Sequence, residues 1–134
     1  MTVLGLDFGL VRTGISISDE KESYAIPLQT VLTKGILDVL LELRERESID
    51  LVVLGYPLSL KGHTNQMTRE VEDFKVQLVQ KGFEVQLFDE RLSTRRAQAS
   101  LHEAGVSARK QKKLKDEMAA SILLQDFLDS KRGK

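Results

Sequence analysis

Three acidic residues stand where the surrounding pattern predicts burial or the end of a strand. Asp7 lies inside the stretch VLGLDFGL, among apolar residues that are typical of a strand. Glu90 directly follows the stretch EVQLFD, and Asp116 begins a predicted helix. An unpaired buried charge costs on the order of several kcal/mol. We therefore expect a basic side chain, backbone N–H groups or a metal ion to compensate Asp7.

Metal binding is the chemistry that these carboxylates favour together. Ligand sites in open α/β sheets form at the ends of strands, where three carboxylates would repel one another unless cations neutralised them. The chain has no Cys, and oxygen ligands alone suit Mg²⁺ or Mn²⁺. A pair of such ions can activate water and stabilise the leaving oxygen in phosphodiester hydrolysis. We predict that Asp7, Glu90 and Asp116 are the metal ligands and the catalytic residues.

Each assignment has an alternative. Asp7 could cap a turn or form a salt bridge with Arg12, which is close in sequence. Asp89 competes with Glu90, because successive side chains of a strand point to opposite faces and only one of the two can share a face with the site. Asp116 could be an ordinary acid at a helix N-terminus, where the helix dipole favours negative charge.

Five strands and four helices are expected to position these residues. Strands are predicted from alternating or continuous apolar residues at 2–8, 13–18, 25–31, 50–55 and 84–89. Helices are predicted from apolar residues at helical spacing at 35–48, 65–81, from Ser93 to about Glu103, and at 116–130. Pro27 indicates that its strand lies at a sheet edge, since Pro lacks the donor that a central ladder needs.

The order of these elements predicts an α/β fold with one mixed five-stranded sheet and helices on both faces. Three antiparallel strands come first, and parallel βαβ units follow. Four apolar residues of helix 35–48 and four of helix 65–81 are expected to face the sheet: Ile36, Val39, Leu40, Leu43, Val71, Phe74, Leu78 and Val79. Asp116 begins the stripe that continues with Ala120, Leu123 and Phe127, and the small Ala119 and Ala120 would let this helix approach the strands closely.

Length and composition indicate a globular protein. The 134 residues are expected to form a single domain, residues 1–134. No apolar run approaches the roughly 20 residues of a membrane span. The N-terminus lacks the basic region of a secretory signal. We therefore expect a cytoplasmic location and no membrane partner.

Basic residues are concentrated in the last third of the chain, although the formal net charge is zero. Between Arg91 and Lys115 they are Arg91, Arg95, Arg96, Arg109, Lys110, Lys112, Lys113 and Lys115. This asymmetry is compatible with nucleic-acid binding, and also with a solvated helix face. Within it, Lys112 and Lys113 are predicted to contact nucleic acid. Lys61 and Asn65, in the loop GYPLSLKGHTN, are expected at the edge where a substrate would lie.

Four motifs, LDFGLVRTGIS, GYPLSLKG, DERLST and KDEMAASILL, resemble in order and spacing the YqgF/RuvX family. The resemblance spans essentially the whole chain. It implies a ribonuclease H-like fold, and it favours Glu90 over Asp89 beside Asp7 and Asp116. It also implies contacts with nucleic acid by Arg12, by the GYPLSLKG loop and by the residues after Glu90, which include Arg91, Ser93, Thr94 and Arg95.

The function that this resemblance implies is hydrolysis of phosphodiester bonds in structured RNA, at the 5′ end of pre-16S ribosomal RNA. Two alternatives stay open. One is cleavage of branched DNA at Holliday junctions, which requires a two-fold dimer; the sequence offers no obvious dimerisation stripe, so we expect a monomer or a weak homodimer. The other is a non-catalytic protein that binds nucleic acid or assists ribosome assembly.

Overall fold

The computed structural model describes residues 1–59, 61–89 and 108–131, and for residues 108–117 it describes the backbone alone. The five strands are β1 (Thr2–Asp7), β2 (Arg12–Ser18), β3 (Ala25–Leu32), β4 (Ile49–Tyr56) and β5 (Val85–Asp89). The described helices are η1 (Thr33–Gly35), α1 (Ile36–Arg46), α2 (Gln66–Gln80) and α4 (Ala108–Lys131). The helix predicted from Ser93 to Glu103 lies outside the described residues.

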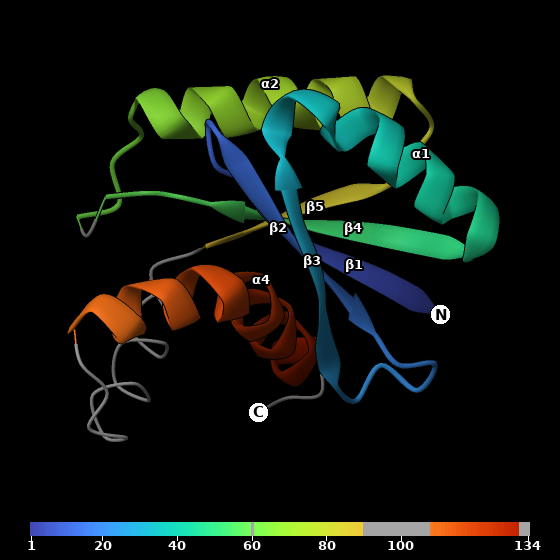
Figure 1. The fold of residues 1–134 in the computed structure, drawn as a ribbon. Coiled ribbons are helices and arrows are strands. Elements are labelled where there is room, and N and C mark those ends of the chain that lie inside the picture. Colours follow the sequence, from blue (N-terminus) through green and yellow to red (C-terminus); the bar gives the residue numbers. More distant parts are fainter. Residues whose placement is uncertain (60, 90–107, 132–134) are drawn as a thin grey trace.

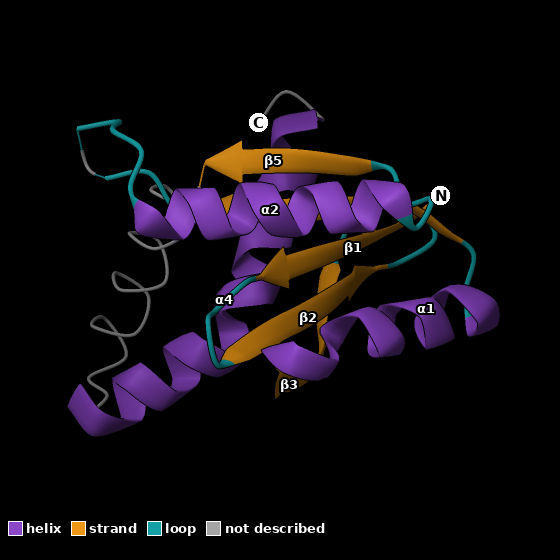
Figure 2. Cartoon of the chain, turned by 90° about the horizontal axis from the view of Figure 1, so that it is seen from above, coloured by secondary structure: helices purple, strands orange, loops and turns teal. Residues whose placement is uncertain are grey.

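The strands form one mixed sheet in the order β3-β2-β1-β4-β5. β1 pairs antiparallel with β2, and β2 with β3. β4 is parallel to β1 and to β5. Figure 2 shows the arrowheads of β1 and β5 pointing to the same side of the molecule, opposite to that of β2. The predicted sheet is confirmed, and Pro27 lies on the edge strand β3.

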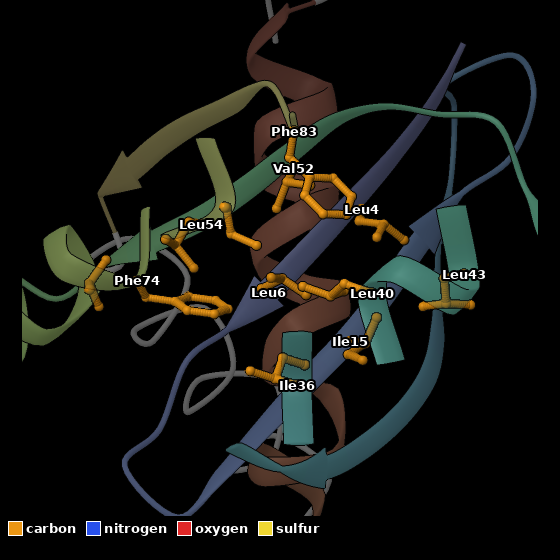
Figure 3. Close-up of a cluster of buried hydrophobic side chains, with 12 residues drawn as sticks. Leu4, Leu6, Ile15, Ile36, Leu40, Leu43, Val52, Leu54, Phe74 and Phe83 are labelled. Atoms are coloured by element: carbon orange, nitrogen blue, oxygen red, sulfur yellow. The ribbon is translucent and has the colours of Figure 1, made fainter. Parts of the chain in front are cut away.

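Helices cover both faces of the sheet, with α1 and α2 on one face and α4 on the other (Figure 1). Alternate strand residues such as Leu4, Leu6 and Leu54 pack against α1 and α2 (Figure 3). The intervening residues Val3 and Val53 pack against α4. This alternation follows from the two-residue period of a strand, and it decides which face each residue at the end of a strand occupies.

Two helix predictions were wrong in detail. The last helix begins at Ala108, not at Asp116. The segment ARKQKKLK contains only good helix formers, and helix propensity outweighs the screened repulsion among its cations. Val79 is 51% exposed, not buried. It lies one residue beyond the buried stripe of Val71, Phe74 and Leu78, and one residue turns the helix by about 100°.

In the part of the chain that the structure describes, no helix is both long enough and apolar enough to cross a membrane.

Candidate active site

Asp7 is the last residue of β1 and is partly buried. It pairs with Gly14 of β2. Because it alternates with Leu6, it shares the α4 face of the sheet with Val3 and Gly5. Arg12 is exposed, and among the residues with described side chains no ion pair or hydrogen bond engages the Asp7 carboxylate. The salt-bridge alternative with Arg12 therefore has no support in the structure.

Thr33 holds the turn that joins Asp7 to Arg12. Its hydroxyl donates to the carbonyl oxygen of Gly9 at 2.6 Å, and its backbone N–H donates to that of Val11 at 2.9 Å. The Thr33 and Thr13 hydroxyl oxygens lie 2.8 Å apart. Gly9 has no room for a side chain, since a Cβ would lie 2.3 Å from the Arg12 carbonyl oxygen. The turn beside Asp7 is thus fixed by several contacts.

Helix α4 lies unusually close to β1 and β2 at Gly5. A Cβ on Gly5 would lie 2.6 Å from Leu124 Cβ and 2.6 Å from Ser16 Oγ. The buried Ser16 hydroxyl contacts two carbonyl oxygens, that of Ala120 at 2.7 Å and that of Gly5 at 3.2 Å. Ala120 is itself buried, so the close approach predicted from the small residues of this helix is confirmed.

The backbone of Asp116 lies in α4, one helical turn before Ala120. It is inside the helix and not in its first turn, so the explanation by the helix dipole does not apply, because that effect is confined to the terminal turn. The side chain of Asp116 is outside the described part. The backbones of Lys112 and Lys113 lie earlier in the same helix.

The structure places Asp89 on the face of the sheet opposite to Asp7. Leu87 packs on the α1–α2 side, whereas the Phe88 ring meets Phe127 of α4 edge-on at 5.9 Å between centroids. Asp89 follows Phe88 and pairs with Tyr56, which also packs on the α1–α2 side. The five remaining predicted site residues of this region lie outside the described residues: Glu90, Arg91, Ser93, Thr94 and Arg95.

The loop after β4 exposes Lys61 but uses Asn65 structurally. Asn65 is the N-cap of α2, and its side-chain oxygen accepts from the Thr68 N–H at 3.0 Å. Its amide nitrogen donates to the Pro57 carbonyl oxygen at 2.9 Å. This role was not predicted from the sequence, although a Thr three residues after an Asn resembles a capping box.

We expect Asn65→Ala to lower the free energy of unfolding by about 1 kcal/mol, the usual loss for an N-cap. Chemical denaturation measures this, with the neighbouring exposed Gln66→Ala as a control that removes no cap. Unchanged stability together with weaker nucleic-acid binding would contradict the capping role and favour the predicted substrate contact.

Tyr56 lies at the C-terminal end of β4, and its hydroxyl donates to the carboxylate of Glu72. This hydrogen bond is the main reason why the pKa of Tyr56 is raised above its ordinary value, and desolvation adds to the effect. An ordinary tyrosine is already protonated at neutral pH, and the raised pKa extends the protonated range of Tyr56 to higher pH. Sequence reasoning gave no signal for this pair, whose members lie on different elements.

Among the described residues, no three acidic or histidine side chains lie close enough together to hold a metal ion. Asp7 is the only predicted metal ligand whose side chain is described. It supplies a partly buried carboxylate at the C-terminal edge of parallel strands, which is the type of donor that Mg²⁺ and Mn²⁺ bind. This donor fits a divalent cation.

The comparisons with known proteins identify the family. Residues 1–130 match the family described as "RuvX: Holliday junction resolvase". A relative from Chlorobaculum tepidum, named "Putative pre-16S rRNA nuclease", is 39% identical over 132 residues, which cover 96% of this chain and 93% of the relative. A relative of the same name from Mycoplasmopsis synoviae is 36% identical over 135 residues, covering 96% of this chain and 98% of the relative.

Solved structures of resolvases share the fold. Thermus thermophilus RuvC, solved with a Holliday junction substrate, superposes with a TM-score of 0.59 at 19% identity, covering 99% of this chain and 97% of that one. The Fowlpox virus resolvase, solved with Holliday junction DNA, gives a TM-score of 0.56 at 14% identity, covering 97% and 98%. These similarities confirm the predicted ribonuclease H-like fold. The chain belongs to the RuvX family.

Proposed function

We propose that this protein is a nuclease that hydrolyses phosphodiester bonds of structured nucleic acid at a divalent-metal site formed by Asp7, Glu90 and Asp116. The observation that carries the proposal is the position of Asp7. Its carboxylate lies on the α4 face, at the edge where the parallel strands end, and no described side chain neutralises it. The family and the names of the relatives support nuclease activity.

The packing of α4 supports Asp116 as a partner of Asp7. Val3 packs against Leu124 and its neighbours, and Gly5 lies against Ala120 and Leu124. Moving from Gly5 to Asp7 advances about 7 Å along the strand. Moving from Ala120 back to Asp116 advances about 6 Å along the helix. Because these two advances are similar in length, the contact between Gly5 and Ala120 favours a neighbouring one between Asp7 and Asp116.

Strand alternation supports Glu90 over Asp89. Gln86 and Phe88 alternate with Leu87 and occupy the α4 face of β5, so a strand that continued by one residue would present Glu90 on that face. Asp7 occupies the same face. The alternation therefore favours Glu90 over Asp89 as the metal ligand.

Each group of residues has a distinct part in the proposed reaction. The three carboxylates would hold Mg²⁺ or Mn²⁺, which when bound supplies an activated water and neutralises charge on the leaving oxygen. Basic and hydroxyl side chains around them would hold the phosphate backbone in register, which fixes its orientation without reading sequence. We assign these contacts to Arg12, Lys61, Arg91, Ser93, Thr94, Arg95, Lys112 and Lys113.

The names of the relatives make a ribosomal RNA precursor the first substrate to consider. We place this reaction in the cytoplasm. Junction DNA is the second, because the family is described as a Holliday junction resolvase. A resolvase needs two active sites related by a two-fold axis. Light scattering at micromolar concentration would therefore separate the two, since a monomer argues against junction resolution.

A cleavage assay with metal titration tests the proposal. Protein stripped with a chelator should cut neither a pre-16S rRNA fragment nor a synthetic four-way DNA junction. Adding Mg²⁺ or Mn²⁺ should restore cleavage of one of them, whereas adding Ca²⁺ at the same concentration controls for charge alone. Equal cleavage in the chelator would contradict a metal-dependent site, and binding without cleavage under every condition would favour the non-catalytic alternative.

A further inference from the structure

The turn between β1 and β2 exposes apolar side chains next to the proposed active site. Leu10 is 59% exposed and Val11 is 69% exposed. We call these two residues the hairpin tip. Single exposed apolar residues are common on protein surfaces. Two adjacent ones at the apex of a turn form a larger apolar surface, and both of these are more than half exposed.

The hairpin tip is held in a fixed position. The Thr33 N–H and hydroxyl bind the carbonyl oxygens of Val11 and Gly9, on either side of Leu10. The buried Thr13 is in contact with the Thr33 hydroxyl. A turn that is ordered before it meets a partner loses little conformational entropy on binding. The tip is therefore suited to insertion into a partner.

The position of the tip relates it to the substrate backbone. Leu10 is three residues from Asp7, so their Cα atoms lie within about 11 Å. This distance corresponds to about three nucleotides at a rise of roughly 3.4 Å per nucleotide along one strand. Arg12 follows the tip directly and is exposed, which places a cation for a phosphate beside the two apolar side chains.

We propose that the hairpin tip inserts as an apolar wedge against unstacked bases of structured nucleic acid, near the bond that is cut. The inference rests on the proposed function. Leu and similar apolar side chains can occupy an opened base step, but unstacking a continuous duplex costs free energy. Bases at a branch point or a bulge are stacked less firmly than those of a regular duplex, so opening a step there costs less free energy and the wedge selects such structures. The tip thus contributes specificity for structure, and Arg12 contributes contact with the backbone.

The test uses a fluorescent adenine analogue that brightens when it unstacks. It is placed at the branch point of a four-way DNA junction and in the bulge of an RNA hairpin. All proteins carry Asp7→Asn, so that the substrate stays intact during the measurement. The protein with the native tip should brighten the probe on at least one substrate. Leu10→Ser/Val11→Ser should lose the brightening and bind that substrate about tenfold more weakly, since burying one such side chain is worth at least a tenfold step.

The matched control is Ile26→Ser/Leu28→Ser, which replaces two apolar side chains that are 50% and 42% exposed on the edge strand β3. Ile26 pairs with Ile17, toward the end of the sheet away from Asp7. The control should keep both the brightening and the affinity. Equal brightening by the tip variant, or none with the native tip, would overturn the inference. If the tip instead joins two copies of the chain, the protein with the native tip should form a dimer and the tip variant should not. The probe signal would then be the same for both proteins.

The probe signal does not depend on cleavage, so the two proposals can fail separately. If wild-type protein never cuts in Mg²⁺, but the brightening of the probe depends on the tip, the wedge proposal stands and the nuclease proposal is contradicted. If wild-type protein cuts a substrate, but the tip variant brightens the probe as much as the protein with the native tip does, the nuclease proposal stands and the wedge proposal is contradicted.

Discussion

Replacing Asp7 by Asn is expected to lower the rate of phosphodiester cleavage by about 1000-fold or more, because it removes a charged ligand from the proposed metal site. Asn keeps the size of the side chain but carries no charge. Folding should be nearly unaffected, with a change of less than about 1 kcal/mol in the free energy of unfolding. The reason is that the carboxylate is only partly buried and has no described partner.

The matched control is Asp38→Asn, which makes the same chemical change at an exposed position in the first turn of α1. This variant should cleave at the wild-type rate. Thermal unfolding of all three proteins separates loss of chemistry from loss of fold. An Asp7→Asn protein that cuts as fast as the wild type would remove Asp7 from the reaction.

Gly5→Ala is expected to cost both stability and activity. The added methyl group would lie 2.6 Å from Leu124 Cβ and 2.6 Å from Ser16 Oγ, both far inside contact distance. Overpacking of this kind costs about 1–3 kcal/mol. For a domain of this size, the melting temperature should fall by about 4–10 °C. The helix can relieve the clash only by moving away from β1.

A displaced α4 would also carry Asp116 away from its proposed place beside Asp7. Misplacement by about 1 Å can cost a factor of about 100 in rate, so kcat of the folded variant should fall by about that factor. Gly35→Ala is the control, because a Cβ there meets nothing within 4 Å. It should change the free energy of unfolding by less than about 1 kcal/mol and leave kcat unchanged. A folded Gly5→Ala protein with wild-type kcat would show that the helix–strand register does not set the active site.

The sequence predicted most of the sheet because its strands carry clear patterns. The apolar run of β4 is buried on both faces, with Val52 and Leu54 on one side and Val53 on the other, as the pattern indicates. The basic start of α4 was missed because it has no apolar periodicity. Only its helix propensity marks it as a helix.

The site was harder to predict than the fold. Alternation in the sequence does not say which face Asp89 occupies, whereas the packing of Phe88 on Phe127 places Asp89 on the face away from α4. The small residues of the last helix predicted its close approach to the strands, but only the folded structure shows that Gly5 is the residue that Ala120 meets. Asn65 was predicted as a substrate contact from its loop position, and that prediction stays open; its capping of α2 was not predicted.

The most direct test of the metal site is a crystal structure of the protein soaked in Mn²⁺, with an anomalous difference map. We predict an anomalous peak about 2.0–2.2 Å from the Asp7 carboxylate, the distance expected for such ions and oxygen ligands, with Asp116 and Glu90 completing the ligand set. A map without a peak at Asp7, in which an arginine or lysine side chain pairs with that carboxylate, would contradict the proposed active site.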